Sequence, residues 1–294
     1  MLHVTIGMIV LNEEEYIERN LRQHYEYADK IIIVEGADRL YPSSRLTPDG
    51  LSTDQTATII SDFPDPSHKI EFIRHGWTHP NSAQAKCELR NEYLRRTPAG
   101  ILLVIDADEF YTHIDLESLL ESCQRQSNIY CWTLPFIHFW RTPNQFITGQ
   151  FYDMIHSRLF RVQPGDTYIN NHNHPSRNGR ELRTAGSFTL PRTVIQQNGT
   201  TNIQRPACFH FGFCKAHANY ADKQQYYEKR GERVTRFRTW KSRRAWFKPD
   251  DRLGFGLKIH PYTGPLPESF TAAQFTHEQP TEDSLPVPDV LQTS

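Results

Sequence analysis

Largely apolar runs alternate with mixed polar segments through the first 110 residues of the chain. Residues 4–11, 31–34, 70–73 and 101–105 are such runs, and they are typical of strands buried on both faces of a parallel sheet. Apolar residues recur at helical spacing after residue 12 and again over 82–96. Strand, helix and strand with short connections form βαβ units. The pattern predicts an α/β fold with a mostly parallel central sheet flanked by helices.

The pattern changes beyond residue 125. Residues 129–134 and 157–162 again predict strands, but aromatic residues, Pro and His crowd between them. Residues 38–51 are polar and contain Pro, so we interpret them as a loop insertion. We divide the chain into a parallel-sheet half over 1–125, a mixed half over 126–264 and a disordered tail over 265–294, where apolar content is low.

Composition narrows the class of protein. A chain of 294 residues can bury a substantial core. Its net charge of −1 gives no global attraction to nucleic acid or membrane, so such affinity must be local. Five cysteines without a CxxC pair fit reduced thiols in a cytosolic protein. No segment approaches the ~20 apolar residues that span a bilayer. We therefore expect a cytoplasmic protein, with any membrane contact peripheral to the inner face.

Carboxylates follow the apolar run at 101–105. Asp106, Asp108 and Glu109 must emerge where that strand leaves the sheet, and ligands of open α/β sheets bind at this edge. Asp106 and Asp108 point to the same side if the extended conformation continues, close enough to share Mn²⁺ or Mg²⁺ or to divide metal and ribose duties. The alternative is a solvated turn that caps the next helix. Earlier in the chain, Asn12 and Glu15 have capping-box spacing and predict that the first helix begins there.

Four motifs in this order resemble those of the family 2 glycosyltransferases. Residues 10–14 are similar to the family's V-x-N-E signature, and residues 106–109 are similar to its DxD motif. The D-G-S-T-D segment is split here by the insertion, with Glu35 where an Asp is usual. The A-x-x-R-N helix resembles residues around 86–91. The positions that carry the resemblance are Asn12, Glu13, Glu35, Asp54, Lys86, Arg90, Asn91, Asp106 and Asp108.

The resemblance implies a GT-A fold, in which residues 1–125 bind the nucleotide-diphosphate sugar and residues 126–264 bind the acceptor. It implies a hexosyltransferase-like enzyme that transfers the sugar with inversion to a hydroxyl of a glycan, a lipid-linked acceptor or a protein. A divalent cation held by Asp108 would neutralise the charge of the leaving diphosphate.

Four residues of these motifs have both a binding role and a structural alternative. Lys86 or Arg90 could support a phosphate, the latter in bidentate fashion. Glu35 and Asp54 could accept hydrogen bonds from the base or the ribose. The alternatives are a solvated helix face for the two basic residues, and turn or cap chemistry for the two acids.

The second half offers further candidates by resemblance. Arg158, followed by His172 and His174, resembles an R-L-F-R…H stretch near the acceptor site of many members, and polar loop histidines are the alternative. His210 lies between aromatic residues where relatives supply a late metal or diphosphate ligand. Neutral imidazole could complete a Mn²⁺ shell begun by Asp108, and a core histidine is the alternative.

The spacing does not determine the catalytic base. An inverting transferase needs a carboxylate or a His to accept the proton of the acceptor hydroxyl. Asp153, Asp166, Glu181 and His174 all lie in the appropriate half. We place Asp153 first because it precedes the strand of Arg158.

Basic residues accumulate over 229–248 with aromatic residues between them. Such a segment could lie on an anionic membrane surface or bind a diphosphate or an acidic acceptor. Single-stranded nucleic-acid binders use the same mixture, although we expect no nucleic-acid partner. A solvated helix with its aromatic residues packed inward is the alternative.

Two other functions remain to be compared. A sugar nucleotidyltransferase would use paired carboxylates too, but residues 12–14 stand where its glycine-rich loop would be. A non-catalytic carbohydrate- or nucleic-acid-binding protein on a GT-A scaffold would not need both Asp106 and Asp108. The presence of both favours a transferase.

Overall fold

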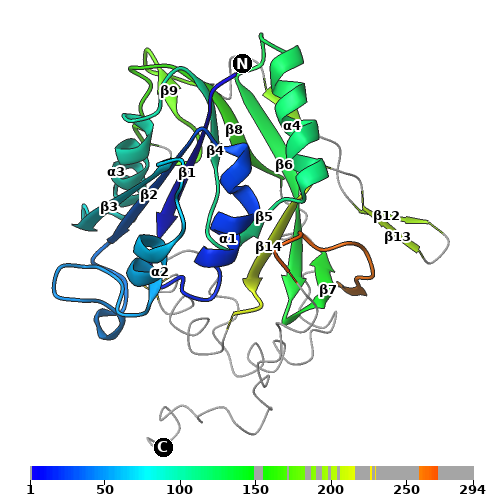
Figure 1. The fold of residues 1–294 in the computed structure, drawn as a ribbon, viewed down its shortest axis with the longest axis horizontal. Helices are drawn as coiled ribbons and strands as arrows, with labels where there is room; N and C mark the ends of the chain where they lie inside the picture. Colours follow the sequence, from blue (N-terminus) through cyan, green and yellow to red (C-terminus); the bar gives the residue numbers. More distant parts are fainter. Residues whose placement is uncertain are drawn as a thin grey trace, which may run out of the picture.

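We analysed a computed structural model, which describes residues 2–148, 155–170, 172–182, 187–189, 194–197, 200–203, 206–215, 226, 229 and 258–270. Its main sheet has the strand order β15-β7-β6-β8-β4-β1-β2-β3 (Figure 1). The strands, in that order, are Lys258–Pro261, Thr142–Thr148, Cys131–Trp140, Ile155–Val162, Gly100–Val104, Val4–Val10, Lys30–Ala37 and Ile70–Trp77.

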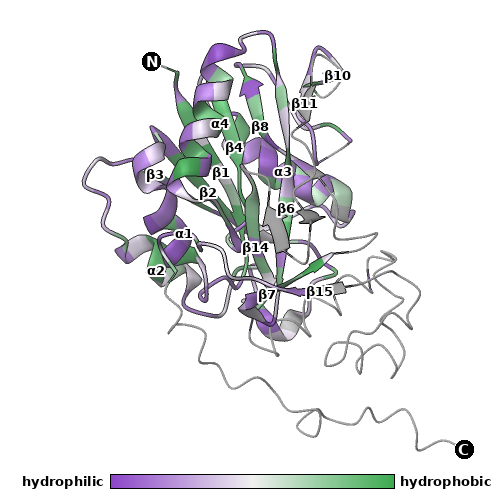
Figure 2. Cartoon of the chain, turned by 90° about the vertical axis from the view of Figure 1, so that its right-hand side faces the viewer, coloured by the Kyte–Doolittle hydropathy of each residue, from purple (hydrophilic) through white to green (hydrophobic). Residues whose placement is uncertain are grey.

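Four parallel strands, β3, β2, β1 and β4, form one half of this sheet. The apolar runs of β1, β2 and β4 are buried on both faces, as the sequence predicts, whereas β3, at the edge of the sheet, is mostly only partly buried. The helices α1 (Ile17–His24), α2 (Thr56–Asp62) and α4 (His113–Arg125) cover one face, and α3 (Ser82–Leu94) covers the other. Figure 2 shows hydrophobic residues concentrated along the central strands. This confirms the α/β fold with a mostly parallel central sheet flanked by helices.

The second half of the sheet is mixed, and it is continuous with the first. Strand β8 pairs antiparallel with β4, and β6 pairs antiparallel with β8. Strand β14 (Cys208–Phe213) lies between β6 and the short β5 (Glu109–Phe110) and pairs with both. In that register His210 is opposite both Glu109 and His138. Strand β14 therefore brings a late segment of the chain to the carboxylates that follow β4.

Shorter elements complete the described residues. Loop residues 38–51 contain one 3₁₀ turn and pack on Trp77, whose indole nitrogen donates to the carbonyl of Pro48 at 2.7 Å. Gly50 has a φ of +79°, and a Cβ there would lie 2.6 Å from the Trp77 ring. The remaining elements are η1 (Tyr25–Tyr27), η2 (Ser43–Arg45), β9 (Ser176–Arg177), β10 (Arg180–Glu181), β11 (Ser187–Thr189), β12 (Val194–Gln197) and β13 (Thr200–Ile203).

The start of the first helix differs from the sequence prediction. Helix α1 begins at Ile17, and Asn12 is not its cap. Asn12 has a φ of +52°, a left-handed conformation that Asn tolerates better than most residues. Its amide donates to the carbonyl of Arg45 at 2.9 Å and accepts from the backbone N–H of Thr53 at 3.1 Å. Asn12 thus links the residues after β1 to the segment that follows β2.

The division into three segments and the cellular location stay predictions. Residues 265–270 are described, and Phe270 is buried against aromatic residues, so the first part of the expected tail belongs to the folded structure. Most of segment 229–248 and all of 271–294 lie outside the described residues. No helix among the described residues is long and apolar enough to cross a membrane.

Candidate active site

A cleft lies at the carboxyl ends of β1 and β2, where ligands of open α/β sheets bind. Helix α3 forms one wall through its first half. That helix begins after Asn81, whose side chain accepts hydrogen bonds from the backbone N–H groups of Ala83 and Gln84. The cleft is lined by Ile9, Val10, Leu11, Asn12, Glu13, Gly36, Ala37, Asp38, Tyr41, Ala85, Lys86, Leu89, Lys215 and Tyr226.

A turn at the end of β4 carries the three carboxylates of the DxD region. The backbone N–H of Glu109 donates to the carbonyl of Asp106 at 2.9 Å, which closes the turn. The buried side chain of Asn20, on α1, donates to three carbonyls of this turn, those of Asp106, Ala107 and Glu109, at 3.3, 3.1 and 2.8 Å. The loop is therefore held by helix α1 as well as by its own backbone.

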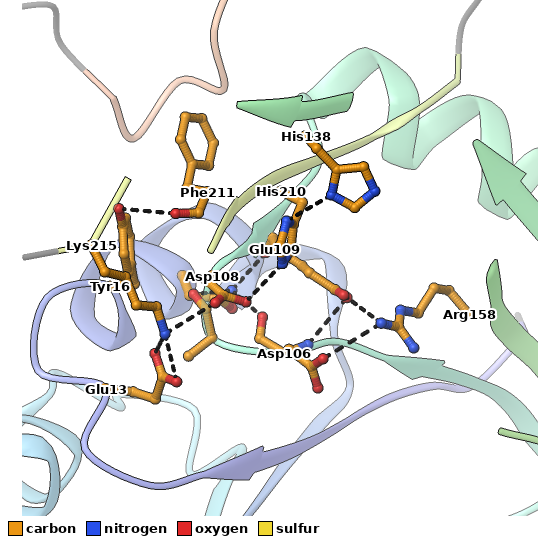
Figure 3. A network of polar contacts seen from close by, with 12 residues as sticks. Glu13, Tyr16, Asp106, Asp108, Glu109, His138, Arg158, His210, Phe211 and Lys215 are labelled. Carbon is orange, nitrogen blue, oxygen red and sulfur yellow. Dashed lines mark hydrogen bonds and ion pairs between the residues drawn. The ribbon is translucent and has the colours of Figure 1, made fainter. Parts of the chain in front are cut away.

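Asp108 lies at the centre of a polar network (Figure 3). Its side chain is 3% exposed, and its Oδ2 lies 3.0 Å from the Nζ of Lys215. The Oδ1 atom lies 3.8 Å from the Nε2 of His210. The Asp108 carbonyl accepts from the backbone N–H of Phe211 at 2.8 Å. Asp108 is thus fixed from both its backbone and its side chain by residues 210–215.

Lys215 also binds the carboxylate of Glu13, shortly after the end of β1. Its Nζ donates to Oε1 and Oε2 of Glu13 at 2.7 and 2.6 Å, and the lysine is buried. One ammonium group therefore joins Glu13, at the end of β1, to Asp108, at the end of β4. A buried ammonium group needs such pairing because its desolvation costs several kcal/mol or more.

His210 is oriented by a second histidine. Its Nδ1 lies 2.9 Å from the Nδ1 of His138, which leaves Nε2 as the nitrogen that faces Asp108. Burial, together with the neighbouring His210, lowers the pKa of His138 well below its ordinary value, so that imidazole is neutral at pH 7. Gly212 leaves room for both groups: a Cβ there would lie 2.6 Å from the Nε2 of His210 and 3.0 Å from the Oδ2 of Asp108.

A buried arginine supports the other two carboxylates. Arg158 forms a short ion pair with Glu109, and its Nη2 lies 3.5 Å from the Oδ2 of Asp106. Burial raises the pKa of Glu109 to about 8, although the charge of Arg158 opposes this shift. Burial also acts to raise the pKa of Asp106. The charges of Arg158 and Arg90 outweigh this effect, and the pKa of Asp106 therefore lies below its ordinary value.

The donor set at Asp108 fits a divalent cation. A carboxylate oxygen of Asp108 and an imidazole nitrogen of His210 face each other at 3.8 Å, longer than a hydrogen bond, beside a glycine whose missing Cβ leaves space. Among the described residues, no group of three or more His, Cys, Asp or Glu is placed to hold a metal ion. Mg²⁺ and similar ions are commonly held by one or two protein groups with the remaining positions filled by water and phosphate.

Several residues predicted from the sequence come together here. Asp106, Asp108, Arg158 and His210 meet at the exit of β4, and Glu13 joins them through Lys215 (Figure 3). Asn12 and Lys86 line the cleft.

Three predicted donor-site residues are used inside the protein instead. Glu35 is fully buried and accepts from the backbone N–H of Ser52 at 2.8 Å and from Nε of Arg74 at 3.1 Å. Asp54 accepts from the backbone N–H groups of Glu14 and Thr56, which is cap and turn chemistry. The amide of Asn91 binds the backbone N–H and carbonyl of Tyr168. These contacts favour the structural alternative for Glu35 and Asp54, and they give Asn91 a structural role as well.

Of the remaining candidates, Arg90 acts on this network only through its charge, His174 and Asp166 have other partners, and Asp153 is outside the described residues. Arg90 is buried, and its guanidinium lies over the ring of Tyr168 at 5.8 Å. His174 is buried, with Nε2 3.0 Å from the hydroxyl of Ser157 and Nδ1 3.7 Å from Glu181. Asp166 binds Arg177. Asp153 lies outside the described residues.

Sequence analysis missed two residues of the site. Asp38 directly follows β2 in the cleft and accepts from the hydroxyl of Tyr226 at 2.6 Å and from the backbone N–H of Leu40 at 2.8 Å. The signal for it was a carboxylate four residues after the predicted strand at 31–34. Lys215 was also missed, and its signal was a single cation that closes an aromatic run five residues after His210.

Comparison with known proteins gives likeness only at the level of structure. No family model matches the chain, and no curated protein matches it in sequence. S. aureus TarS 1–349 matches over 78% of this chain and 63% of its own, with 11% identity and a TM-score of 0.36. In complex with UDP, TarS 1–349 matches over 49% of this chain and 37% of its own, with 16% identity and a TM-score of 0.30.

A second kind of protein is also similar in part. Glucosyl-3-phosphoglycerate synthase from Mycobacterium tuberculosis, in complex with Mn²⁺, UDP and phosphoglyceric acid, has 17% identity and a TM-score of 0.30. The match covers 48% of this chain and 44% of that one. The chain thus spans less than two thirds of the length of each of these structures.

Proposed function

We propose that this protein is a GT-A glycosyltransferase of the family 2 type, which moves a sugar from a nucleotide-diphosphate donor to a hydroxyl acceptor. The observation that supports this most is the meeting of Asp108 and His210 beside the cleft at the ends of β1 and β2. A neutral imidazole and a carboxylate form a small site for Mn²⁺ or Mg²⁺, next to space for a nucleotide.

The residues of the cleft suggest how the donor lies. Asp38 and Tyr41, at the end of β2, stand where a base or ribose would be held, with the carboxylate as hydrogen-bond acceptor. Lys86, on α3, supplies positive charge on the other wall for a phosphate. Asp106, 47% exposed and with a lowered pKa, is ionised at neutral pH and can accept hydrogen bonds from ribose hydroxyls.

The cation would be held by Asp108 and His210, with Asp106 nearby as a second carboxylate. When bound, it supplies a Lewis acid that stabilises the negative charge of the leaving diphosphate. The protein's own part is to keep these ligands in place. Arg158 holds the turn through Glu109 and Asp106, and His138 orients the ring of His210.

Transfer with inversion to a glycan, a lipid-linked acceptor or a protein hydroxyl stays part of the proposal. Asp153 is still our first candidate for the base that accepts the proton of the acceptor hydroxyl, and His174 is the second. Peripheral membrane contact through 229–248 would suit a lipid-linked acceptor.

The proposal is tested by calorimetric titration of UDP, GDP, CDP and dTDP, each with Mn²⁺ and with EDTA. We expect one nucleotide to bind in a metal-dependent manner, and Asp108→Asn to abolish that dependence. Asp62→Asn, an exposed carboxylate on α2, is the matched control and should bind as the wild type does. Failure of the folded wild type to bind any of the four nucleotides would contradict the proposal.

A further inference from the structure

Lys215 is a cation already seated at the carboxylate that would hold the metal. We propose that Lys215 holds Asp108 and Glu13 together in the nucleotide-free protein and turns onto the diphosphate when the donor binds. Divalent cation then binds together with the nucleotide and not ahead of it. This inference rests on the proposed function, because it assigns a role within the same donor site.

The geometry supports an ammonium that substitutes for a cation. Its Nζ lies 2.7 and 2.6 Å from the oxygens of Glu13 and 3.0 Å from the Oδ2 of Asp108. The side chains of Lys215 and Asp108 are 5% and 3% exposed. Two carboxylates this close repel each other, and a positive charge between them removes that repulsion. In the absence of a divalent ion, Lys215 supplies the charge.

The place of Lys215 also suits a diphosphate. Lys215 and Glu13 line the same cleft as Lys86, which stands on helix α3. A diphosphate group in that cleft would therefore meet an ammonium group on two sides. The lysine stem has four flexible carbons and ends in a point charge, so its Nζ can turn from a carboxylate to a phosphate without a change in the backbone.

The balance of charge explains why the lysine must move. Glu13 and Asp108 contribute −2 and Lys215 contributes +1, so the three groups together carry −1. A nucleoside diphosphate brings several further negative charges into the same cleft. Its binding becomes favourable when Lys215 faces the phosphates and a divalent cation takes over the neutralisation of Asp108.

Replacement of Lys215 by a neutral residue should change the affinity for Mn²⁺ and the affinity for the nucleotide in opposite directions. Lys215→Met keeps the length of the side chain and removes its charge, which leaves two carboxylates uncompensated. Mn²⁺ should then bind the nucleotide-free protein about tenfold more tightly than it binds the wild type, and the nucleotide should bind about tenfold more weakly in the presence of Mn²⁺. Free Mn²⁺ is measured by its electron paramagnetic resonance signal, and nucleotide binding by calorimetry.

Lys86→Met is the matched control. It removes a lysine of helix α3, whereas Lys215 is the lysine that pairs with both Asp108 and Glu13, so it should weaken nucleotide binding and change the nucleotide-free affinity for Mn²⁺ much less than Lys215→Met does. Lys215→Gln serves if Lys215→Met does not fold, as judged by circular dichroism, because Gln can still hydrogen-bond to both carboxylates without a charge. The same opposite effects are expected for it.

The outcomes separate this inference from the proposed function. If the wild type binds a nucleotide with Mn²⁺ but neutral variants of Lys215 leave the nucleotide-free Mn²⁺ affinity unchanged, the inference is overturned and the proposed function stands. If Mn²⁺ affinity rises in these variants and nucleotide affinity does not fall, the role toward the diphosphate is overturned. If the wild type binds none of the nucleotides, the proposed function fails, and the role of Lys215 in donor binding fails with it.

Discussion

Gly212 occupies the space between the two groups that would hold a cation. A Cβ at this position would lie 2.5 and 2.6 Å from Cε1 and Nε2 of His210 and 3.0 Å from the Oδ2 of Asp108. We therefore predict that Gly212→Ala displaces the imidazole and weakens metal-dependent nucleotide binding at least about tenfold, measured by calorimetry.

Gly165→Ala is the control for the cost of the extra methyl group. Gly165 has a φ of +94°, so Ala there is strained by about 1 kcal/mol, and no atom lies within 4 Å of the added Cβ. It should lower the free energy of unfolding and leave nucleotide binding intact. Equal loss of binding in both variants would show that general destabilisation, and not the space beside His210, is responsible.

His24 makes the stability of the fold depend on pH. It is 1% exposed, and its Nδ1 lies 2.9 Å from the carbonyl of Asn20. Burial lowers its pKa from 6.5 to about 3. Below pH 6.5 the unfolded chain binds a proton at this residue and the folded chain does not. The contribution of His24 to the free energy of unfolding is thus fully present above pH 6.5 and is lost as the pH falls toward 3.

The variant His24→Gln isolates this contribution. Between pH 7.5 and pH 5 its free energy of unfolding should fall by about 2 kcal/mol less than that of the wild type, measured by urea denaturation at each pH. His79→Gln, at an exposed position, is the control and should follow the wild type. Parallel pH profiles for His24→Gln and the wild type would contradict the assignment.

Candidate residues could be named from the sequence where chemistry directly follows a strand, and could not be named where partners are distant. Asp106 and Asp108 were candidates because carboxylates directly follow a buried apolar run. Asn12 was taken for a helix cap because its actual partners, Arg45 and Thr53, lie 33 and 41 residues away. Lys215 was not identified because its partner Glu13 is 202 residues away, beyond any local pattern.

An aromatic cluster supports strand β14. Phe211 stacks on Phe270 with ring centroids 4.3 Å apart, and Phe110 meets Phe270 edge-on at 4.5 Å. The backbone N–H of Phe211 donates to Asp108, so this cluster stabilises the element that carries the site. Residues 258–270 therefore support the site although they lie far from it in sequence.

Phe270→Ala should lower the free energy of unfolding by about 3–5 kcal/mol, because it empties a buried aromatic position. Chemical denaturation measures this change. Ile114→Ala removes an apolar side chain that is 69% exposed and should change stability by no more than about 0.5 kcal/mol. A loss below about 1 kcal/mol for Phe270→Ala would mean that residues 258–270 do not support this cluster.

Elements with a strong local signal were predicted, and those defined by distant pairing were not. Strands β1, β2 and β4 have largely apolar runs, and helix α3 has Ala85, Leu89 and Tyr93 at helical spacing. The pairing of β14 between β5 and β6 has no counterpart in local sequence, because its partners are 99 to 101 positions away in β5 and 72 to 73 positions away in β6. The same holds for β15, which pairs with β7.

For the whole molecule, the continuous sheet makes the two halves mutually dependent. Strand β4 pairs with β8, and the apolar cluster under β1 and β4 includes Trp132, Leu159 and Cys208. We predict that a fragment ending at residue 125 does not fold stably, because it exposes this cluster and leaves β4 without its neighbour β8. Circular dichroism and limited proteolysis test this prediction.

The control for that fragment is residues 1–270, which retain every described element. This longer fragment should unfold in one transition, with the midpoint of the full chain. A protease-resistant fragment 1–125 with native circular dichroism would instead establish the first half as an independent domain.

The ion pair between Glu13 and Lys215 also has a consequence for biosynthesis. Because its partners are 202 residues apart, the centre of the proposed donor site cannot assemble until the chain through Lys215 has left the ribosome. During that interval β4 and the Asp108 turn exist without β14. Contacts of such large sequence separation slow folding, since loop-closure entropy is lost before they form. The nascent chain should therefore depend on chaperones until β14 has emerged.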